Sequence, residues 1–171
     1  MQMTDAAAGA APPLPQGRFA GRDAFRQLVR DALACAAREG WRELLLCDAS
    51  FEDWPLGERA VAETLLAWSR NGRRLTLLAC GYAGLQRQHP RFVAWRRTWD
   101  HIIECRGCRQ ADPLEFPSVV WSPAWTLQRL DTRHSTGWCG SEPERRVQVR
   151  ECVDEWLRKS AAAFPATTLG L

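Results

Sequence analysis

The sequence is poor in lysine, histidine and tyrosine, and it has no long apolar run. Lys159 is the only lysine among 23 basic residues, so the other 22 are arginine; there are three histidines and one tyrosine. No stretch approaches the roughly 20 apolar residues that a bilayer span requires, so no membrane-spanning segment is expected. The N-terminus lacks the basic and apolar blocks of a secretory signal, and we therefore expect a cytoplasmic protein.

Several catalytic signatures are missing as well. No glycine-rich phosphate fingerprint follows either of the first two predicted strands, which argues against nucleotide binding of the dinucleotide or P-loop type. No G-x-S-x-G elbow is present, which argues against a serine hydrolase of the α/β type. The sequence predicts no cofactor.

Composition indicates an ordinary folded chain. With 171 residues, 46% apolar and 25% charged, it has enough material for one packed domain. We expect an Ala/Pro-rich flexible tail over residues 1–20, a single domain over 21–164 and a short tail over 165–171. The net charge of +3 is too small to identify a nucleic-acid binder. The arginine excess fits either a codon bias or phosphate recognition by the bidentate guanidinium fork.

Apolar spacing predicts alternating helices and strands in the first two thirds of the chain. Helices are expected from Arg22 to Gly40, over 57–70, from Gly81 to His89 and from Pro90 through Trp99. Strands are expected over 43–47, 73–80 and 102–105. Alternation of this kind indicates a parallel sheet with right-handed crossovers.

The last third has a different pattern. Residues 118–122 and 125–131 are strand-like, and the short connection between them only permits antiparallel neighbours. A loop over 132–143, with a small strand around Trp138, precedes a long C-terminal helix whose apolar face runs from Val149 to Phe164. The predicted fold class is α/β: a mixed sheet with three parallel strands joined by crossover helices, then an antiparallel hairpin and a long final helix.

Two carboxylates follow the first predicted strand. Open α/β sheets bind ligands beyond the carboxyl ends of their strands, so Asp48 and Asp53 are candidate site residues. The alternative for Asp48 is a loop or cap residue that accepts backbone N–H bonds. His89, next to a proline, is expected at the surface.

A single C-x-x-C motif offers weak candidates for a metal site. Cys105 and Cys108, with His101 upstream, are residue types that zinc prefers, but zinc needs four such ligands. The alternative is a pair of plain thiols at the end of a strand, and most of the seven cysteines are expected to be buried small hydrophobes.

Five segments together resemble phospholipase D-like domains, and most closely a short bacterial group of that fold without known activity. They are Leu44–Asp48, Phe51–Leu56, His89–Phe92 with Trp95–Arg97, the paired strands ending in Asp131, and the closing helix with Trp156. The resemblance covers residues 19–160. It implies the fold described above and a possible homodimer, because active relatives pair two motifs across a symmetric interface.

The family motif is H-x-K-x-x-x-x-D, in which histidine attacks phosphorus, lysine binds phosphate oxygens and aspartate supports the site. In this sequence the same positions hold Ala124, Thr126 and Asp131. Alanine cannot form a covalent phosphoryl intermediate, and threonine has neither the charge nor the reach of lysine. The resemblance therefore predicts a catalytically inactive domain that acts as a binding or regulatory module.

Two alternatives remain open at this stage. One is a phosphodiesterase or nuclease with a rearranged site, in which His134 and Asp131 are the catalytic candidates. Its phosphate-binding candidates are Arg129, Arg133, Arg91 and Arg96. This alternative requires His134 within hydrogen-bond reach of Asp131 in a concave pocket. The other is a zinc-stabilised interaction domain built on Cys105 and Cys108.

Overall fold

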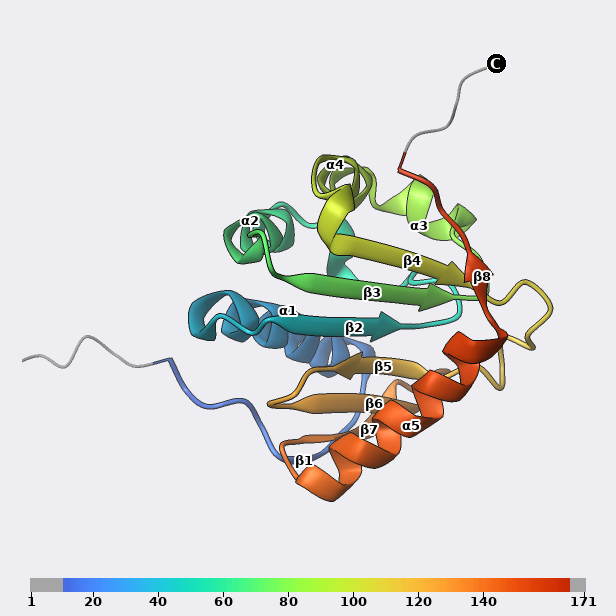
Figure 1. Cartoon of the computed structure of the whole chain (residues 1–171). Coiled ribbons are helices and arrows are strands. Elements are labelled where there is room, and N and C mark those ends of the chain that lie inside the picture. Colours follow the sequence, from blue (N-terminus) through green and yellow to red (C-terminus); the bar gives the residue numbers. More distant parts are fainter. Residues whose placement is uncertain (1–10, 167–171) are drawn as a thin grey trace, which may run out of the picture.

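A single eight-stranded mixed sheet forms the centre of the computed structural model, which describes residues 11–166 (Figure 1). The strand order is β1-β7-β6-β5-β2-β3-β4-β8. The strands are β1 (Gly17–Phe19), β2 (Glu43–Cys47), β3 (Arg74–Ala79), β4 (Ile103–Gly107), β5 (Ser118–Trp121), β6 (Thr126–Asp131), β7 (Thr136–Gly140) and β8 (Ala161–Ala162). The helices are α1 (Arg22–Glu39), α2 (Arg59–Trp68), α3 (Ala83–Gln88), α4 (Pro90–Thr98) and α5 (Pro143–Lys159), with short 3-10 turns at Pro55–Gly57 and Asp100–Ile102.

The parallel half of the sheet follows from the apolar runs in the sequence. β2 pairs in parallel with β3, and β3 with β4, which confirms the three expected parallel strands. Strands of this kind are buried on both faces and therefore read as nearly continuous apolar segments. Helices α1, α2 and α4 cover one face, and their apolar residues share one core cluster with Leu44, Leu46, Leu75 and Leu77.

The antiparallel half is joined to β2 through β5. β5 runs antiparallel to β2, β6 to β5 and β7 to β6, so the expected hairpin is present. As a result, the carboxyl end of β2 lies beside the start of β5 and the end of β6. These three segments, which are far apart in the sequence, therefore meet at one end of the central strands.

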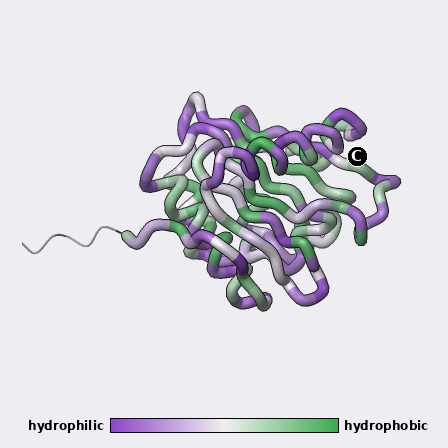
Figure 2. Tube along the Cα trace, turned by 90° about the horizontal axis from the view of Figure 1, so that it is seen from below, coloured by the Kyte–Doolittle hydropathy of each residue, from purple (hydrophilic) through white to green (hydrophobic). Residues whose placement is uncertain are grey.

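Helix α5 alone packs on the opposite face (Figure 1). Val149 and Val153 insert into a second core cluster with Leu45, Cys47 and Leu78. Arginine also contacts aromatic rings here, because Arg150 lies 4.7 Å from the ring centre of Trp121. Figure 2 shows the hydrophobic stretches gathered in the interior and hydrophilic stretches along the outside.

The two ends of the domain differ from the prediction. The flexible tail was expected to reach residue 20, but Gly17–Phe19 form β1 and pair with β7. The part of that tail at residues 1–10, and of the C-terminal tail at 167–171, lies outside the described residues. The final helix was expected to present Phe164, but α5 ends at Lys159. Residues 161–162 then pair with β4, and the Phe164 ring stacks on Tyr82 at 5.1 Å.

None of the helices within residues 11–166 has both the length and the apolar character needed to cross a bilayer.

Candidate functional site

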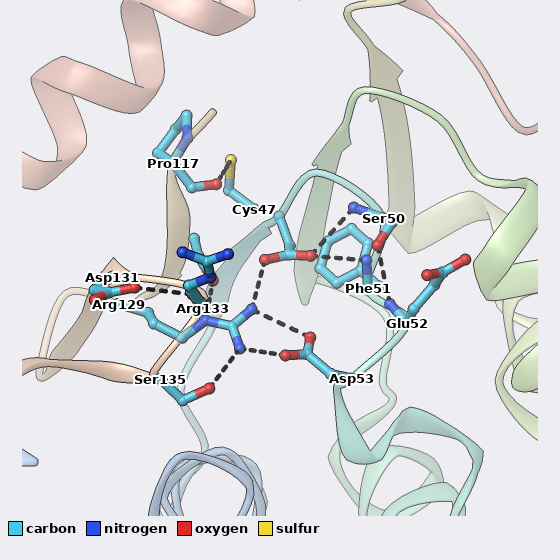
Figure 3. A network of polar contacts seen from close by, with 12 residues as sticks. Cys47, Ser50, Phe51, Glu52, Asp53, Pro117, Arg129, Asp131, Arg133 and Ser135 are labelled. Carbon is cyan, nitrogen blue, oxygen red and sulfur yellow. Dashed lines mark hydrogen bonds and ion pairs between the residues drawn. The ribbon is translucent and has the colours of Figure 1, made fainter. Parts of the chain in front are cut away.

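Arg129, on β6, lies at the centre of a polar network at the carboxyl edge of β2 (Figure 3). Its side chain is 2% exposed and donates to two carboxylates. Nη2 lies 3.0 Å from Asp48 Oδ1, and Nη1 lies 2.5 Å from Asp53 Oδ2. Two hydroxyls complete the set, because Nε donates to Ser118 and Nη1 to Ser135. All three guanidinium nitrogens are therefore bonded within the protein.

An aromatic ring also packs against the guanidinium group of Arg129. The guanidinium carbon of Arg129 lies 4.0 Å from the ring centre of Phe25, on α1. A guanidinium over an aromatic face at this distance is attracted by the ring quadrupole. One side chain therefore connects α1, the loop after β2, and the β5–β6 hairpin.

Asp48 has two roles in the same place. Its Oδ1 receives Arg129, while Oδ2 accepts the backbone N–H groups of Ser50 and Phe51 at 3.1 and 2.8 Å. The second contact holds Phe51 in a left-handed conformation, with φ of 59°. The capping role considered for Asp48 is thus present, together with an ion pair.

The same loop is held from the helical side. Arg26 donates to the carbonyl of Asp53, and His89 donates through Nε2 to the carbonyl of Phe51 at 2.8 Å. His89 is only 5% exposed, so the expected surface position was wrong. The reason is that His89, between α3 and α4, packs against this loop and bonds the carbonyl of Phe51, which also accepts the backbone N–H of Trp54 at 3.3 Å.

The two carboxylates of the network stabilise the charged form of Arg129. Burial lowers the pKa of Arg129, but hydrogen bonding and charge from Asp53 and Asp48 outweigh it, so its pKa is raised above the ordinary value. The arginine therefore stays charged at any physiological pH. Two carboxylates around one guanidinium leave a net charge of about −1, so the network does not attract a phosphate.

The two positions that the motif assigns to histidine and lysine lie at the start of β6, at the opposite end of the strands from the Arg129 network. Ala124 belongs to the turn between β5 and β6, which is closed by the Ser122 hydroxyl. Thr126 is fully buried, and its hydroxyl donates to the carbonyl of Val120 at 2.9 Å. Neither side chain can attack phosphorus or neutralise a phosphate oxygen.

The segment before β1 covers the start of β6 and the end of β7. The carbonyl of Pro15 accepts the indole N–H of Trp125 at 3.0 Å and also the thiol of Cys139. The amide oxygen of Gln16 accepts the backbone N–H of Ser141 at 2.8 Å. A cavity of about 390 Å³ remains beside it, lined by this segment, by Trp41 and Trp125 and by Ala124. The start of β6 is therefore packed against the protein's own chain.

His134 and Asp131 form a pair at the tip of the β6–β7 hairpin. His134 Nδ1 lies 2.8 Å from Asp131 Oδ2, and the hydrogen bond from His134 lowers the pKa of Asp131. The side chains are 69% and 46% exposed. The other oxygen of Asp131 accepts the backbone N–H groups of Arg133 and His134, which is the usual role of an aspartate in a tight turn.

The phosphate-binding candidates do not gather around this pair. Arg129 points into the core, whereas Arg133 is exposed at the hairpin tip. Arg91 and Arg96 belong to α4. Arg91 donates to the carbonyl of Gly57, and the buried Arg96 bonds Asp100 and the carbonyl of Phe164.

The weak metal candidates are also separated. Cys105 belongs to the core cluster under α1, α2 and α4, whereas Cys108 belongs to the cluster under α5 on the other face of the sheet. His101 is bonded to Asn71. No group of three or more potential ligands gathers anywhere between residues 11 and 166. These three side chains therefore cannot bind one ion together.

Sequence reasoning named Asp48, Asp53 and Arg129 but did not connect them, and it missed Ser118, Ser135 and Phe25. Contacts across 76 or 81 positions leave no local signal. A buried strand that contains an arginine, as β6 does, is the one feature that pointed to an internal partner, because a buried charge must be paired.

Comparison with solved structures supports the fold. TrmBL2, an archaeal chromatin protein whose structure shows a novel mode of DNA binding, aligns with a TM-score of 0.65 at 14% identity over 91% of this chain. This chain spans 57% of the length of TrmBL2. NucT from Helicobacter pylori aligns with a TM-score of 0.57 at 7% identity, over 86% of this chain and 98% of NucT. The chain thus shares a mixed α/β fold with these two proteins, and the expected fold class is confirmed.

Sequence comparison adds nothing to this. No protein-family model matches the chain, and no curated protein matches it. At these low identities the structural likeness establishes the architecture alone.

Proposed function

We propose that this protein is a catalytically inactive phospholipase D-like domain that serves as a binding module for a phosphate-containing ligand. The observation that carries the proposal is the chemistry at the start of β6. Ala124 and Thr126 stand where the motif has its nucleophile and its cation, and the Thr126 hydroxyl is used by a backbone carbonyl. The fold is retained while both reactive groups are absent.

The packing of the N-terminal segment supports the same conclusion. Pro15 and Gln16 use the polar groups of Trp125 and Ser141 that border this edge. A substrate phosphate would have to compete with these bonds and would find no ammonium or imidazole there. DNA binding by TrmBL2, which shares the fold, is compatible with a ligand that contains phosphate.

The decisive experiment is a hydrolysis assay on the full chain with bis-p-nitrophenyl phosphate, with and without divalent cations. We expect no release of nitrophenolate above the buffer rate, for wild type and for His134→Ala alike. Turnover by wild type that disappears in His134→Ala would overturn the proposal. Arg59→Ala, which removes a side chain 83% exposed, is the matched surface control.

A second candidate is a phosphodiesterase that uses His134 and Asp131. The 2.8 Å contact between them favours it, because a carboxylate bonded to Nδ1 orients an imidazole for attack through Nε2. Against it, both side chains are exposed, and Arg129 is already bonded to Asp48 and Asp53. The same assay decides between the two candidates.

Homodimer formation, which the resemblance implies, stays a prediction. Light scattering coupled to size exclusion at several protein concentrations measures it directly. A mass of twice 19.3 kDa would support the dimer.

A further inference from the structure

The starts of β2 and β3 carry a second group of arginines, unrelated to the Arg129 network. Arg42 precedes β2, and residues 69–73 connect α2 to Arg74, the first residue of β3, at the same end of the neighbouring strand (Figure 1). The two segments are bonded directly, because the backbone N–H of Arg74 donates to the carbonyl of Arg42 at 2.8 Å. Three side chains from this region, Arg42, Arg70 and Arg73, surround a cavity of about 350 Å³ together with Asn71 and Gly72.

The cavity has no carboxylate in its lining, unlike the cavities beside Trp41 and beside Trp156. Some other arginines are paired with acids, as in the ion pairs Arg30–Glu58 and Arg150–Glu43. Between residues 11 and 166, no carboxylate lies within ion-pair distance of any arginine of this group, and Arg42, Arg70 and Arg74 are exposed. Within residues 11–166, these guanidinium groups are therefore not held in ion pairs.

Arg73 hydrogen-bonds the C-terminal ends of two helices beside this cavity. Its Nη1 donates to the carbonyl of Gly40 at 2.7 Å and its Nε to that of Trp68 at 3.3 Å. These carbonyls end α1 and α2, whose C-termini carry partial negative charge. Arg73 offsets that charge, so the remaining arginines face an incoming anion without opposition from the helix ends.

An aromatic surface adjoins the arginines. Asn71, which lines the cavity, is bonded through Oδ1 to His101 Nε2 at 3.1 Å. The exposed His101 ring lies 5.4 Å from the half-buried ring of Trp99, at an interplanar angle of 30°. A planar ring held beside cationic groups is the arrangement on which an unpaired base stacks while its phosphate is neutralised.

We propose that this edge binds single-stranded nucleic acid, with Arg42 and Arg70 on successive backbone phosphates and His101 stacked on a base. The inference rests on the proposed function, a phosphate-binding module without catalysis, and names its site and ligand class. Guanidinium groups match phosphate oxygens bidentately, so a cavity lined by arginines suits a ligand with backbone phosphates. The net charge of the whole chain is only +3, whereas Arg42, Arg70 and Arg73 gather positive charge around this one cavity.

The test is fluorescence anisotropy of a fluorescein-labelled oligo(dT) 20-mer titrated with the full chain at several salt concentrations. Arg42→Ala with Arg70→Ala is compared with Arg59→Ala with Arg158→Ala, which removes the same charge from other exposed sites. We expect the first pair to weaken binding at least about tenfold and to lower the salt slope by about 1.4, or 0.7 for each lost phosphate contact. The control pair should change affinity less than about twofold.

Three outcomes separate the possibilities. Equal weakening by both pairs would overturn the proposed site and leave the inactive domain standing. Unchanged affinity in His101→Ala, combined with equally tight binding of inorganic polyphosphate, would overturn the nucleic-acid ligand in favour of a bare phosphate polymer. Turnover of bis-p-nitrophenyl phosphate would instead contradict the proposed function, whatever the binding data show. Circular dichroism melts establish that each variant is folded.

Discussion

The guanidinium of Arg129 lies 3.0 Å from the carboxylate of Asp48 although 81 positions separate the two residues. Asp48 follows β2 and Arg129 lies on β6, and β5 stands between these strands. The pair therefore spans the point where the parallel half of the sheet meets the antiparallel half. It fixes the loop after β2 to the β5–β6 hairpin.

Removal of Arg129 should destabilise the fold severely. In Arg129→Ala, Asp48 and Asp53 face each other without a cation, and breaking a buried ion pair from one side costs about 3–5 kcal/mol. Urea unfolding followed by tryptophan fluorescence measures this as a lower midpoint. Arg133→Ala, at the exposed hairpin tip, should stay within about 0.5 kcal/mol of wild type. A similar small loss in both variants would show that the network contributes little.

Rebuilding the motif should not restore catalysis. Thr126 is fully buried, so Thr126→Lys places an ammonium beside the carbonyl of Val120 without an anion, at a cost of about 3 kcal/mol or more. Thr126→Val, which removes only the hydroxyl bond, should cost about 1 kcal/mol. Chemical denaturation compares the two. Activity of Ala124→His with Thr126→Lys on the nitrophenyl reporter would show that the site is more open than the structure indicates.

Two glycines outside helices should respond differently to alanine. A Cβ on Gly137 would lie 2.8 Å from the Cα of Arg129 and closer still to the carbonyl of Gln128, both backbone atoms. A Cβ on Gly81 meets nothing within 4 Å. We therefore expect Gly137→Ala to lose about 1–3 kcal/mol and Gly81→Ala to be nearly neutral. Thermal melts of the two proteins side by side test this, and equal midpoints would refute the close approach of β6 and β7.

Stability should fall at alkaline pH. Burial raises the pKa of Cys80, Cys105 and Cys139 to about 11, while thiols in the unfolded chain ionise near the ordinary pKa of 9.0. The folded state therefore retains protons that the unfolded state releases, so this contribution is complete below pH 9 and is lost as the pH rises towards 11. Melting temperatures between pH 8 and 11 should decline, and the decline should be shallower in Cys105→Ala than in wild type. A flat profile would contradict the raised pKa values.

Most of the parallel half could be predicted from the sequence because its signals are local. Apolar runs such as Leu44–Cys47 identify doubly buried strands, and Gly40 marks the end of α1, where φ is 69°. The end of α5 could not be predicted in the same way. Phe164 continues the apolar spacing of the helix, but its ring finds Tyr82 across the sheet, and the chain leaves the helix at Ser160 to reach it. Helical periodicity carries no record of that partner.

The candidate site likewise has some features that the sequence shows and others that depend on tertiary packing. The absence of histidine and lysine from the motif, and the presence of a C-x-x-C, are visible in the order of residues. Whether Cys105 and Cys108 face one another depends on the strand between them, which sends their side chains into cores on opposite faces. His89 was placed at the surface from its neighbours, and tertiary packing placed it in the core.

The sequence by itself determined which side chains stand at positions 124 and 126, since folding cannot give alanine an imidazole or threonine an ammonium group. It also determined the alternating pattern of buried segments, because hydrophobic spacing acts over a few residues. Only the tertiary structure decided that Arg129 is paired with Asp48 and Asp53, while Arg42 and Arg70 have no ion pair with any residue between 11 and 166. The physical reason is that the charge of an arginine is a property of the residue, but its partner is a property of position in space.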